Sequence, residues 1–140
     1  MDQRPEILII DAQGGGVGRL LVSAVRQELP AAVLTAAGGN SAATAAMLKA
    51  GADQGATGEN AVVVACRRAD VIMGPIGIVI ADSMLGEITP RMAAAVAQSG
   101  AKRILIPFDH CDNVVVGVAE TGMKALVKEA VSVLADIVKA

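Results

Sequence analysis

The residues with the clearest chemical character form a glycine run that follows a short apolar segment. Residues 11–21 read DAQGGGVGRLL, directly after the apolar run 7–10. A turn of this kind leaves free N–H groups at the start of a helix, where those groups and the helix dipole attract anions. Three consecutive glycines exceed what a turn needs. The run predicts a ligand-binding loop made of Asp11, Gln13, Gly14, Gly15, Gly16, Val17 and Gly18.

The spacing of this run departs from both common phosphate-binding motifs. Gly14 and Gly16 match the first two glycines of G-x-G-x-x-G, but Arg19 stands at the third position. A P-loop needs Lys and then Ser or Thr after its last glycine, whereas Arg19 and Leu20 follow Gly18. ATP hydrolysis by a P-loop mechanism is therefore disfavoured. A purely structural role, in which the glycines permit a tight turn and close helix packing, is the alternative.

Two further unusual segments end expected strands. Asn40 and Ser41 follow the segment 33–37, and Gly74, Pro75 and Gly77 follow the segment 71–73. Ligands of open parallel sheets bind beyond the carboxyl ends of the strands, so these residues are predicted to complete the site. Ser41 is equally suited to capping a helix, and the Gly-Pro-Ile-Gly stretch to starting one with a kink. The first choice of ligand is NAD(P), the second a flavin or adenine nucleotide, and no metal is expected.

Residues 109–113, Asp-His-Cys-Asp-Asn, place the histidine of the chain beside a cysteine. Histidine can lower the pKa of a nearby thiol or relay a proton, which predicts, as an alternative, a small enzyme that uses His110 and Cys111. Neighbouring residues of an extended segment point in opposite directions, however, so a solvated loop is the favoured interpretation. One histidine and one cysteine do not make a zinc site.

Composition excludes several classes of partner. The chain has 140 residues, a formal net charge of −2, 54% hydrophobic residues and 1% aromatic residues. Nucleic-acid binding needs a basic face or stacking aromatics, and both are missing. No apolar run approaches the length of a membrane span, and the start lacks a signal-peptide pattern. We expect a single cytoplasmic domain with reduced thiols, which forms a homo-oligomer through the apolar stretch 76–85 and the alanine-rich helix 42–50.

Apolar periodicity predicts an alternation of strands and helices. Strands are expected over 7–10, 33–37, 71–73, 103–108 and 114–118. Helices are expected over 17–29, 41–50, 61–69, 76–85 and 89–99, with a last helix that buries apolar residues from Leu126 to Val138. The glycine-rich segment 51–58 is expected to be a loop. This pattern predicts an α/β fold, a single three-layer αβα Rossmann-like domain over residues 1–140 with a mostly parallel sheet of about five strands. The strand orders 3-2-1-4-5 and 2-1-3-4-5 both stay open.

Four segments together resemble a known family. They are IIDAQGGGVGRLL, NSAATAAMLKAGADQGATGENAVVV, ADVIMGPIGIVIADSMLGEITPRMA and RILIPFDHC. They are similar to a family of short bacterial proteins catalogued as a domain of unknown function, often met in anaerobes, and the resemblance extends to about residue 118. It implies a small Rossmann-like domain and supplies no activity, substrate or catalytic residue.

Overall fold

The computed structural model describes residues 4–108, 112–118 and 121–139, and within them the strands form one parallel sheet of order β3-β2-β1-β4-β5. The strands are β1 (Glu6–Asp11), β2 (Val33–Gly38), β3 (Gln54–Thr57), β4 (Val71–Pro75) and β5 (Lys102–Ile106). The helices are α1 (Gly16–Glu28), α2 (Ser41–Ala50), α3 (Glu59–Cys66), α4 (Pro90–Gln98) and α5 (Met123–Lys139), with a short 3-10 helix η1 (Ile76–Val79).

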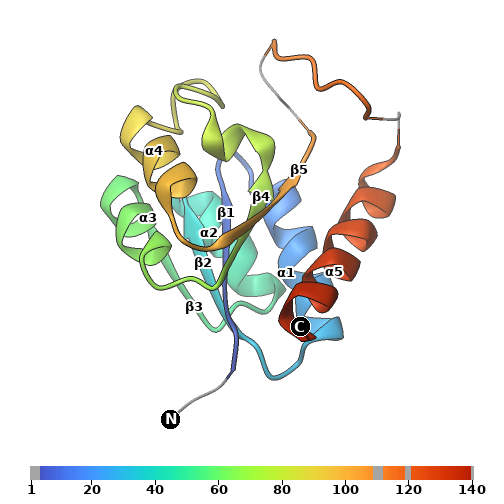
Figure 1. The fold of residues 1–140 in the computed structure, drawn as a ribbon. Helices are drawn as coiled ribbons and strands as arrows, with labels where there is room; N and C mark the ends of the chain where they lie inside the picture. The colour runs from blue at the N-terminus through green and yellow to red at the C-terminus, as the bar shows by residue number, and fades with distance from the viewer. Residues whose placement is uncertain (1–3, 109–111, 119–120, 140) are drawn as a thin grey trace.

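The helices cover the two faces of the sheet as separate layers (Figure 1). On one face, α1, α2 and α5 bury a core that includes Leu21, Met47 and Leu134. On the other, α3 and α4 bury a second core around Val62, Met92 and Val96. The central strand β1 is buried on both faces, which explains why residues 7–10 are a continuous apolar run rather than an alternating one.

The predicted three-layer α/β fold with a parallel five-stranded sheet is confirmed, and the structure selects the first of the two strand orders. Parallel strands need crossovers, and the crossover through α3 explains why residues 61–69 are mainly helical despite three consecutive valines. Thr89 caps α4 as expected, with its hydroxyl oxygen accepting a hydrogen bond from the N–H of Met92.

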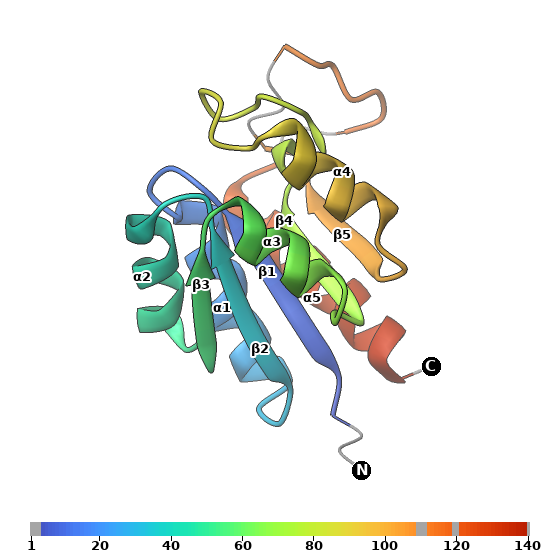
Figure 2. The same ribbon diagram turned by 90° about the vertical axis from the view of Figure 1, so that its left-hand side faces the viewer.

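Three predicted elements are wrong. The segment 51–58 is not a plain loop, because residues 54–57 pair with β2 as the edge strand β3, which exposes all four of its residues and so lacks an apolar pattern. The expected strand 114–118 is irregular and lies beyond β5 at one end of the sheet (Figure 2). The expected helix 76–85 is only the 3-10 turn η1, because the backbone of Asp82, Met84 and Leu85 enters the left-handed region.

Candidate functional site

The candidate site is a crevice at the carboxyl edge of the sheet, between the loops that follow β1 and β4. The chain leaves β1 toward α1 on one face and leaves β4 toward η1 and α4 on the other, so the adjacent strands diverge at the switch in strand order. Such switch points are the usual ligand sites of open α/β sheets. A cavity of about 100 Å³ lies there, lined by Asp11, Ala12, Gln13, Gly14, Gly16, Val17, Pro75, Met84 and Phe108.

Asp11 places a carboxylate of the chain itself inside the glycine loop. Its Oδ2 accepts a hydrogen bond from the N–H of Gly18 at 2.7 Å, and its Oδ1 accepts one from the N–H of Ala12 at 2.8 Å. The amide of Val17 also contributes a hydrogen bond to this carboxyl. Asp11 is only 4% exposed, and burial raises its pKa above the ordinary value of 3.8, although the three amide hydrogen bonds act in the opposite direction.

This internal anion changes what the loop can bind. The N–H groups of Val17 and Gly18 belong to the helix turn expected to hold a phosphate, but Asp11 already occupies them. The Glu87 carboxylate adds a further negative charge that raises the pKa of Asp11. A second anion at the same two amides would meet both carboxylates. The anion-binding hypothesis therefore narrows to the outer backbone of the loop, at Gly14 and Gly16.

The glycines of the run divide into two kinds. A Cβ on Gly18 would lie 2.6 Å from Met47 Sδ and 2.8 Å from Asp11 Cβ, and Gly15 combines a φ of +73° with a 3.0 Å approach to the Cα of Ala43. These two glycines are required by the packing of α1 against α2. Gly14 and Gly16 are exposed, and a Cβ on either would meet nothing within 4 Å. The fold gives no steric reason for glycine at those two positions.

Asn40 and Glu87 connect the loops around the crevice. Asn40 caps α2, since its Oδ1 accepts a hydrogen bond from the N–H of Ala43 at 2.9 Å, and its Nδ2 donates to the Gln13 carbonyl at 2.9 Å and to Glu87 Oε2 at 2.6 Å. Glu87 Oε1 accepts a hydrogen bond from the N–H of Gln13 at 3.0 Å. The structure thus brings Gln13 and Asn40 together. Ser41, the expected cap, is exposed as the first residue of α2, and Asn40 caps this helix instead.

Replacement Glu87→Ala is expected to loosen the Gln13 loop while leaving the global fold in place. Glu87 is half-buried, so the free energy of unfolding should fall by only about 1 kcal/mol, the value of an ordinary hydrogen bond or two. Hydrogen exchange at the Gln13 amide should accelerate, because its acceptor is removed. Exchange followed by NMR checks this, with Glu28→Ala, an exposed glutamate of α1, as the control. An unchanged Gln13 exchange rate would contradict the proposed connection.

The predicted site residues at the end of β4 and the start of η1 divide into those required by packing and those that line the cavity. Gly74 is buried, and a Cβ there would lie 2.4 Å from the carbonyl oxygen of Ile10, so close approach of β4 to β1 requires glycine. The carbonyl of Gly77 accepts a hydrogen bond from the Ser83 hydroxyl, and a Cβ on Gly77 would lie 3.1 Å from that hydroxyl oxygen. Of the three predicted residues of this stretch, only Pro75 lines the cavity.

Three residues that line the cavity were not among the predicted site residues: Ala12, Met84 and Phe108. Glu87, which is hydrogen-bonded to Gln13 and Asn40, was not predicted either. Met84 belongs to the loop 80–88, in which Asp82, Met84 and Leu85 all have positive φ. Left-handed conformations of non-glycine residues cost about 1 kcal/mol or more each and concentrate at functional sites. Leu85, at 96% exposed, stands at the tip of this loop. Of these residues, only Phe108 could have been found from the sequence, because it is an aromatic residue at the carboxyl end of a predicted strand.

His110 and Cys111 lie outside the described residues. The other cysteine, Cys66, is buried, and burial raises its thiol pKa from 9.0 to about 11, which makes it a poor nucleophile. Across the described ranges, no cluster of three or more His, Cys, Asp or Glu side chains is arranged to hold a metal ion. In that same part of the chain, the helices are too short or too polar to cross a membrane.

The fold is similar to that of a solved enzyme. The crystal structure of a dodecameric FMN-dependent UbiX-like decarboxylase from Escherichia coli O157:H7 superimposes with a TM-score of 0.52 and 17% sequence identity, covering 96% of this chain and 95% of that chain. This likeness corrects the prediction of an NAD(P)-type dinucleotide protein, because the similar enzyme depends on FMN. Independently, Asp11 takes up the Val17 and Gly18 amides, which are two of the amides on which a phosphate was predicted to lie.

Comparison with curated proteins finds no match. A family model does match, and it covers residues 6–139, which is nearly the whole chain. The resemblance inferred from the four sequence segments is thereby confirmed. The chain belongs to the family described as a domain of unknown function (DUF3842).

Proposed function

We propose that this protein binds a flavin of the FMN type at the crevice between the β1 and β4 loops and does so as a homo-oligomer. The observation that carries the proposal is the open backbone at Gly14 and Gly16, on the wall of a switch-point cavity, where the fold has no need for glycine. Glycine at such positions lets a ligand approach the main chain closely. The likeness to an FMN-dependent enzyme over nearly the whole of both chains supports the choice of ligand class.

The chemistry of the crevice walls suits a planar, largely uncharged ring. Pro75, Met84 and Phe108 supply apolar surface to the lining of the cavity, and the backbone of Gly14 and Gly16 supplies polar groups. Phe108 is 48% exposed and therefore accessible for stacking. The open backbone of Gly14 and Gly16 would hold the flavin phosphate, because the Asp11 and Glu87 carboxylates repel an anion beside them. When bound, a flavin supplies electron and hydride transfer, which the protein tunes through such contacts.

The size of the cavity supports the oligomeric part of the proposal. Its volume of about 100 Å³ is below the roughly 300–1,000 Å³ of pockets that enclose small ligands, so one chain provides only part of a site. Leu85, the neighbour in sequence of the cavity-lining Met84, is 96% exposed, and in the segment beyond β5 Val114 is 89% and Val116 92% exposed. Exposed apolar side chains of this size supply surface that a second copy of the chain would cover in the proposed oligomer. We therefore propose that a second copy of the chain completes the site for the small ligand.

The glycine substitutions Gly14→Ala and Gly16→Ala are expected to separate binding from folding. Each should leave the melting temperature unchanged or slightly higher, because alanine is favoured over glycine wherever its Cβ fits and φ is negative. Each should weaken FMN binding by about tenfold or more, equivalent to about 1.4 kcal/mol, because the added methyl group stands on the ligand side of the backbone.

The measurement is titration with FMN, riboflavin and FAD, followed by flavin fluorescence and by thermal melting, together with light scattering to determine the oligomeric state. The control is Gly100→Ala, at an exposed glycine whose added Cβ also meets nothing within 4 Å. Unchanged flavin affinity in both loop variants, or no flavin binding by the unmodified protein at millimolar concentration, would overturn the proposal.

A further inference from the structure

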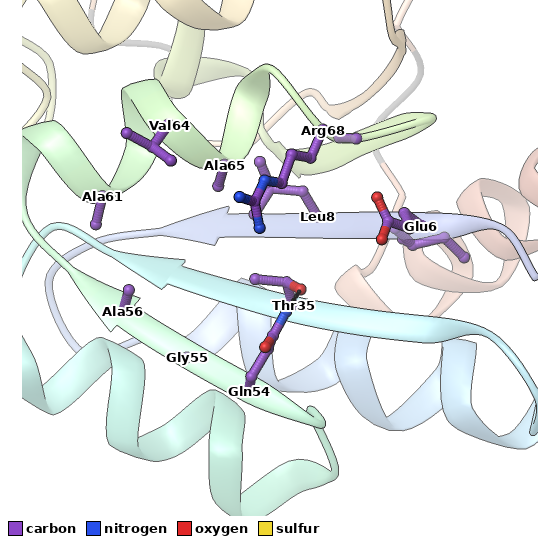
Figure 3. Close-up of a pocket in the computed structure, with 12 residues that line it drawn as sticks. Glu6, Leu8, Thr35, Gln54, Gly55, Ala56, Ala61, Val64, Ala65 and Arg68 are labelled. Carbon is purple, nitrogen blue, oxygen red and sulfur yellow. Dashed lines mark hydrogen bonds between the residues drawn. The ribbon is translucent and has the colours of Figure 1, made fainter. Parts of the chain in front are cut away.

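A second concavity lies far from the glycine loop, on the face of the sheet covered by α3 and α4. It has a volume of about 260 Å³ and is bounded by α3 on one side and by β1, β2 and β3 on the other. None of the residues that line it also lines the crevice at the carboxyl edge. Figure 3 shows it as a groove that runs alongside α3, above the edge strand β3.

The helix side of this groove is built from small residues. Ala61, Val64 and Ala65 face the strands across it, and Ala56 lies opposite them on β3 (Figure 3). Protein interiors are normally filled to near-crystalline density, and larger aliphatic side chains at these alanine positions would fill the space. The groove is therefore an apolar slot that the chain leaves open by its choice of alanine.

One end of the slot carries a cation that has no partner among the described residues. Arg68 extends from the chain just beyond α3, and its guanidinium hangs between that helix and the strands, above Thr35 (Figure 3). Within the part of the chain that the structure describes, this guanidinium makes no salt bridge and no hydrogen bond. The carboxylate of Glu6 lies farther along β1 and is not paired with it (Figure 3). The hydroxyl of Thr35 accepts a hydrogen bond from Gln54 at 2.9 Å, so the floor beneath Arg68 is polar.

We propose that this groove binds a small organic monocarboxylate, with the carboxylate on Arg68 and the apolar body along Ala56, Ala61 and Val64. A guanidinium pairs with carboxylates through two parallel N–H···O hydrogen bonds, which favours this anion over a neutral group. The opposite end of the slot is apolar, and burying a second charge there carries a desolvation cost, so dicarboxylates are excluded. A volume just under that of drug-sized pockets fits a chain of a few carbon atoms.

The proposal is tested with hexanoate as the probe, and with hexan-1-ol and adipate as comparison ligands, by NMR chemical-shift titration of the full chain. Hexanoate is expected to shift the amides of Ala56, Val64 and Arg68 in a saturable manner, with affinity about tenfold higher than hexan-1-ol or adipate. Arg68→Ala should weaken hexanoate binding by about tenfold, as loss of a charge-assisted hydrogen bond predicts. Arg67→Ala, at an exposed arginine that does not line the groove, is the matched control and should bind normally.

A filling variant gives an independent readout. Ala65→Leu should close the slot, abolish hexanoate binding and leave thermal stability unchanged or higher, since the new side chain occupies existing space. Equal affinity for hexanoate and hexan-1-ol, or hexanoate binding that survives both Arg68→Ala and Ala65→Leu, would overturn the proposal. Because the groove shares no residue with the crevice, a failure here leaves the flavin proposal standing, and the reverse also holds.

Discussion

Replacement of Gly74 by alanine is expected to lower the free energy of unfolding by about 3 kcal/mol, the upper range for inserting a methyl group into a packed core. The new Cβ would lie 2.4 Å from the carbonyl oxygen of Ile10 and 3.0 Å from the Cδ1 atom of Ile78. The first contact is with the backbone of the central strand, which cannot rotate away as a side chain can. Accommodation would require β4 to move away from β1, at the centre of the sheet.

Denaturant unfolding and thermal melting measure this effect, which should appear as a decrease in melting temperature on the order of 10 °C for a domain of this size. Gly100→Ala is the matched control, because Gly100 is exposed and its added Cβ meets nothing within 4 Å. A change of less than 1 kcal/mol at Gly74 would show that the glycine is not required by packing. In that case its predicted role in ligand binding would regain support.

Replacement of Asp11 by alanine should have the second large effect, a loss of about 3 kcal/mol. The N–H groups of Ala12 and Gly18 would lose their acceptor in a buried environment, and an unsatisfied buried donor costs about 1–3 kcal/mol. The start of α1 has no other side-chain cap, because its N-cap residue is Gly15. Chemical denaturation of Asp11→Ala measures the loss, with Asp136→Ala, an exposed aspartate of α5, as the control.

The pH dependence of stability offers a separate test of Asp11. Its pKa in the folded state lies above the ordinary value of 3.8, chiefly because burial penalises the charged form. The folded state therefore binds the proton of the Asp11 carboxyl more tightly than the unfolded state does. The contribution of this proton binding to the free energy of unfolding is largest below pH 3.8 and is lost as pH rises through the raised folded pKa.

Asp53 acts in the opposite direction, since a hydrogen bond from the backbone of Leu34 lowers its pKa. Titration of the Asp11 carboxyl carbon by NMR separates the two groups. A folded-state pKa at or below 3.8 would contradict the expected direction.

Much of the architecture could be predicted from sequence because burial dictates it. A continuous apolar run predicts the central strand β1, because that strand is buried on both faces. Thr89 followed by Pro90 predicts the start of α4. The edge strand β3 could not be predicted from the apolar pattern, because an exposed four-residue strand needs no apolar side chains. Its pairing with β2 specifies it instead. The prediction of a strand over 114–118 was wrong. It rested on Val114 and Val116, because β-branched residues favour strands, yet both are exposed in an irregular segment.

The sequence predicts which loops meet at the candidate site, but not what each residue of those loops does there. The convergence of loops after β1, β2 and β4 follows from the parallel sheet, and the structure does bring Gln13 and Asn40 within hydrogen-bond distance. What each glycine does depends on neighbours distant in sequence, such as Met47 for Gly18 and Ile10 for Gly74. Likewise, nothing in the sequence indicated that the carboxyl of Asp11, three residues before Gly14, would accept hydrogen bonds from the amides of α1.

This hydrogen bonding of Asp11 has a consequence for how the loop is maintained. In many phosphate-binding loops the ligand accepts hydrogen bonds from the start of the helix, whereas here the Asp11 carboxyl of the chain itself accepts them. The amides at the start of α1 therefore have an acceptor from the chain itself. Under the proposed flavin binding, folding and cofactor loading would be separable events, and newly made chains would reach the native fold before they acquire the flavin.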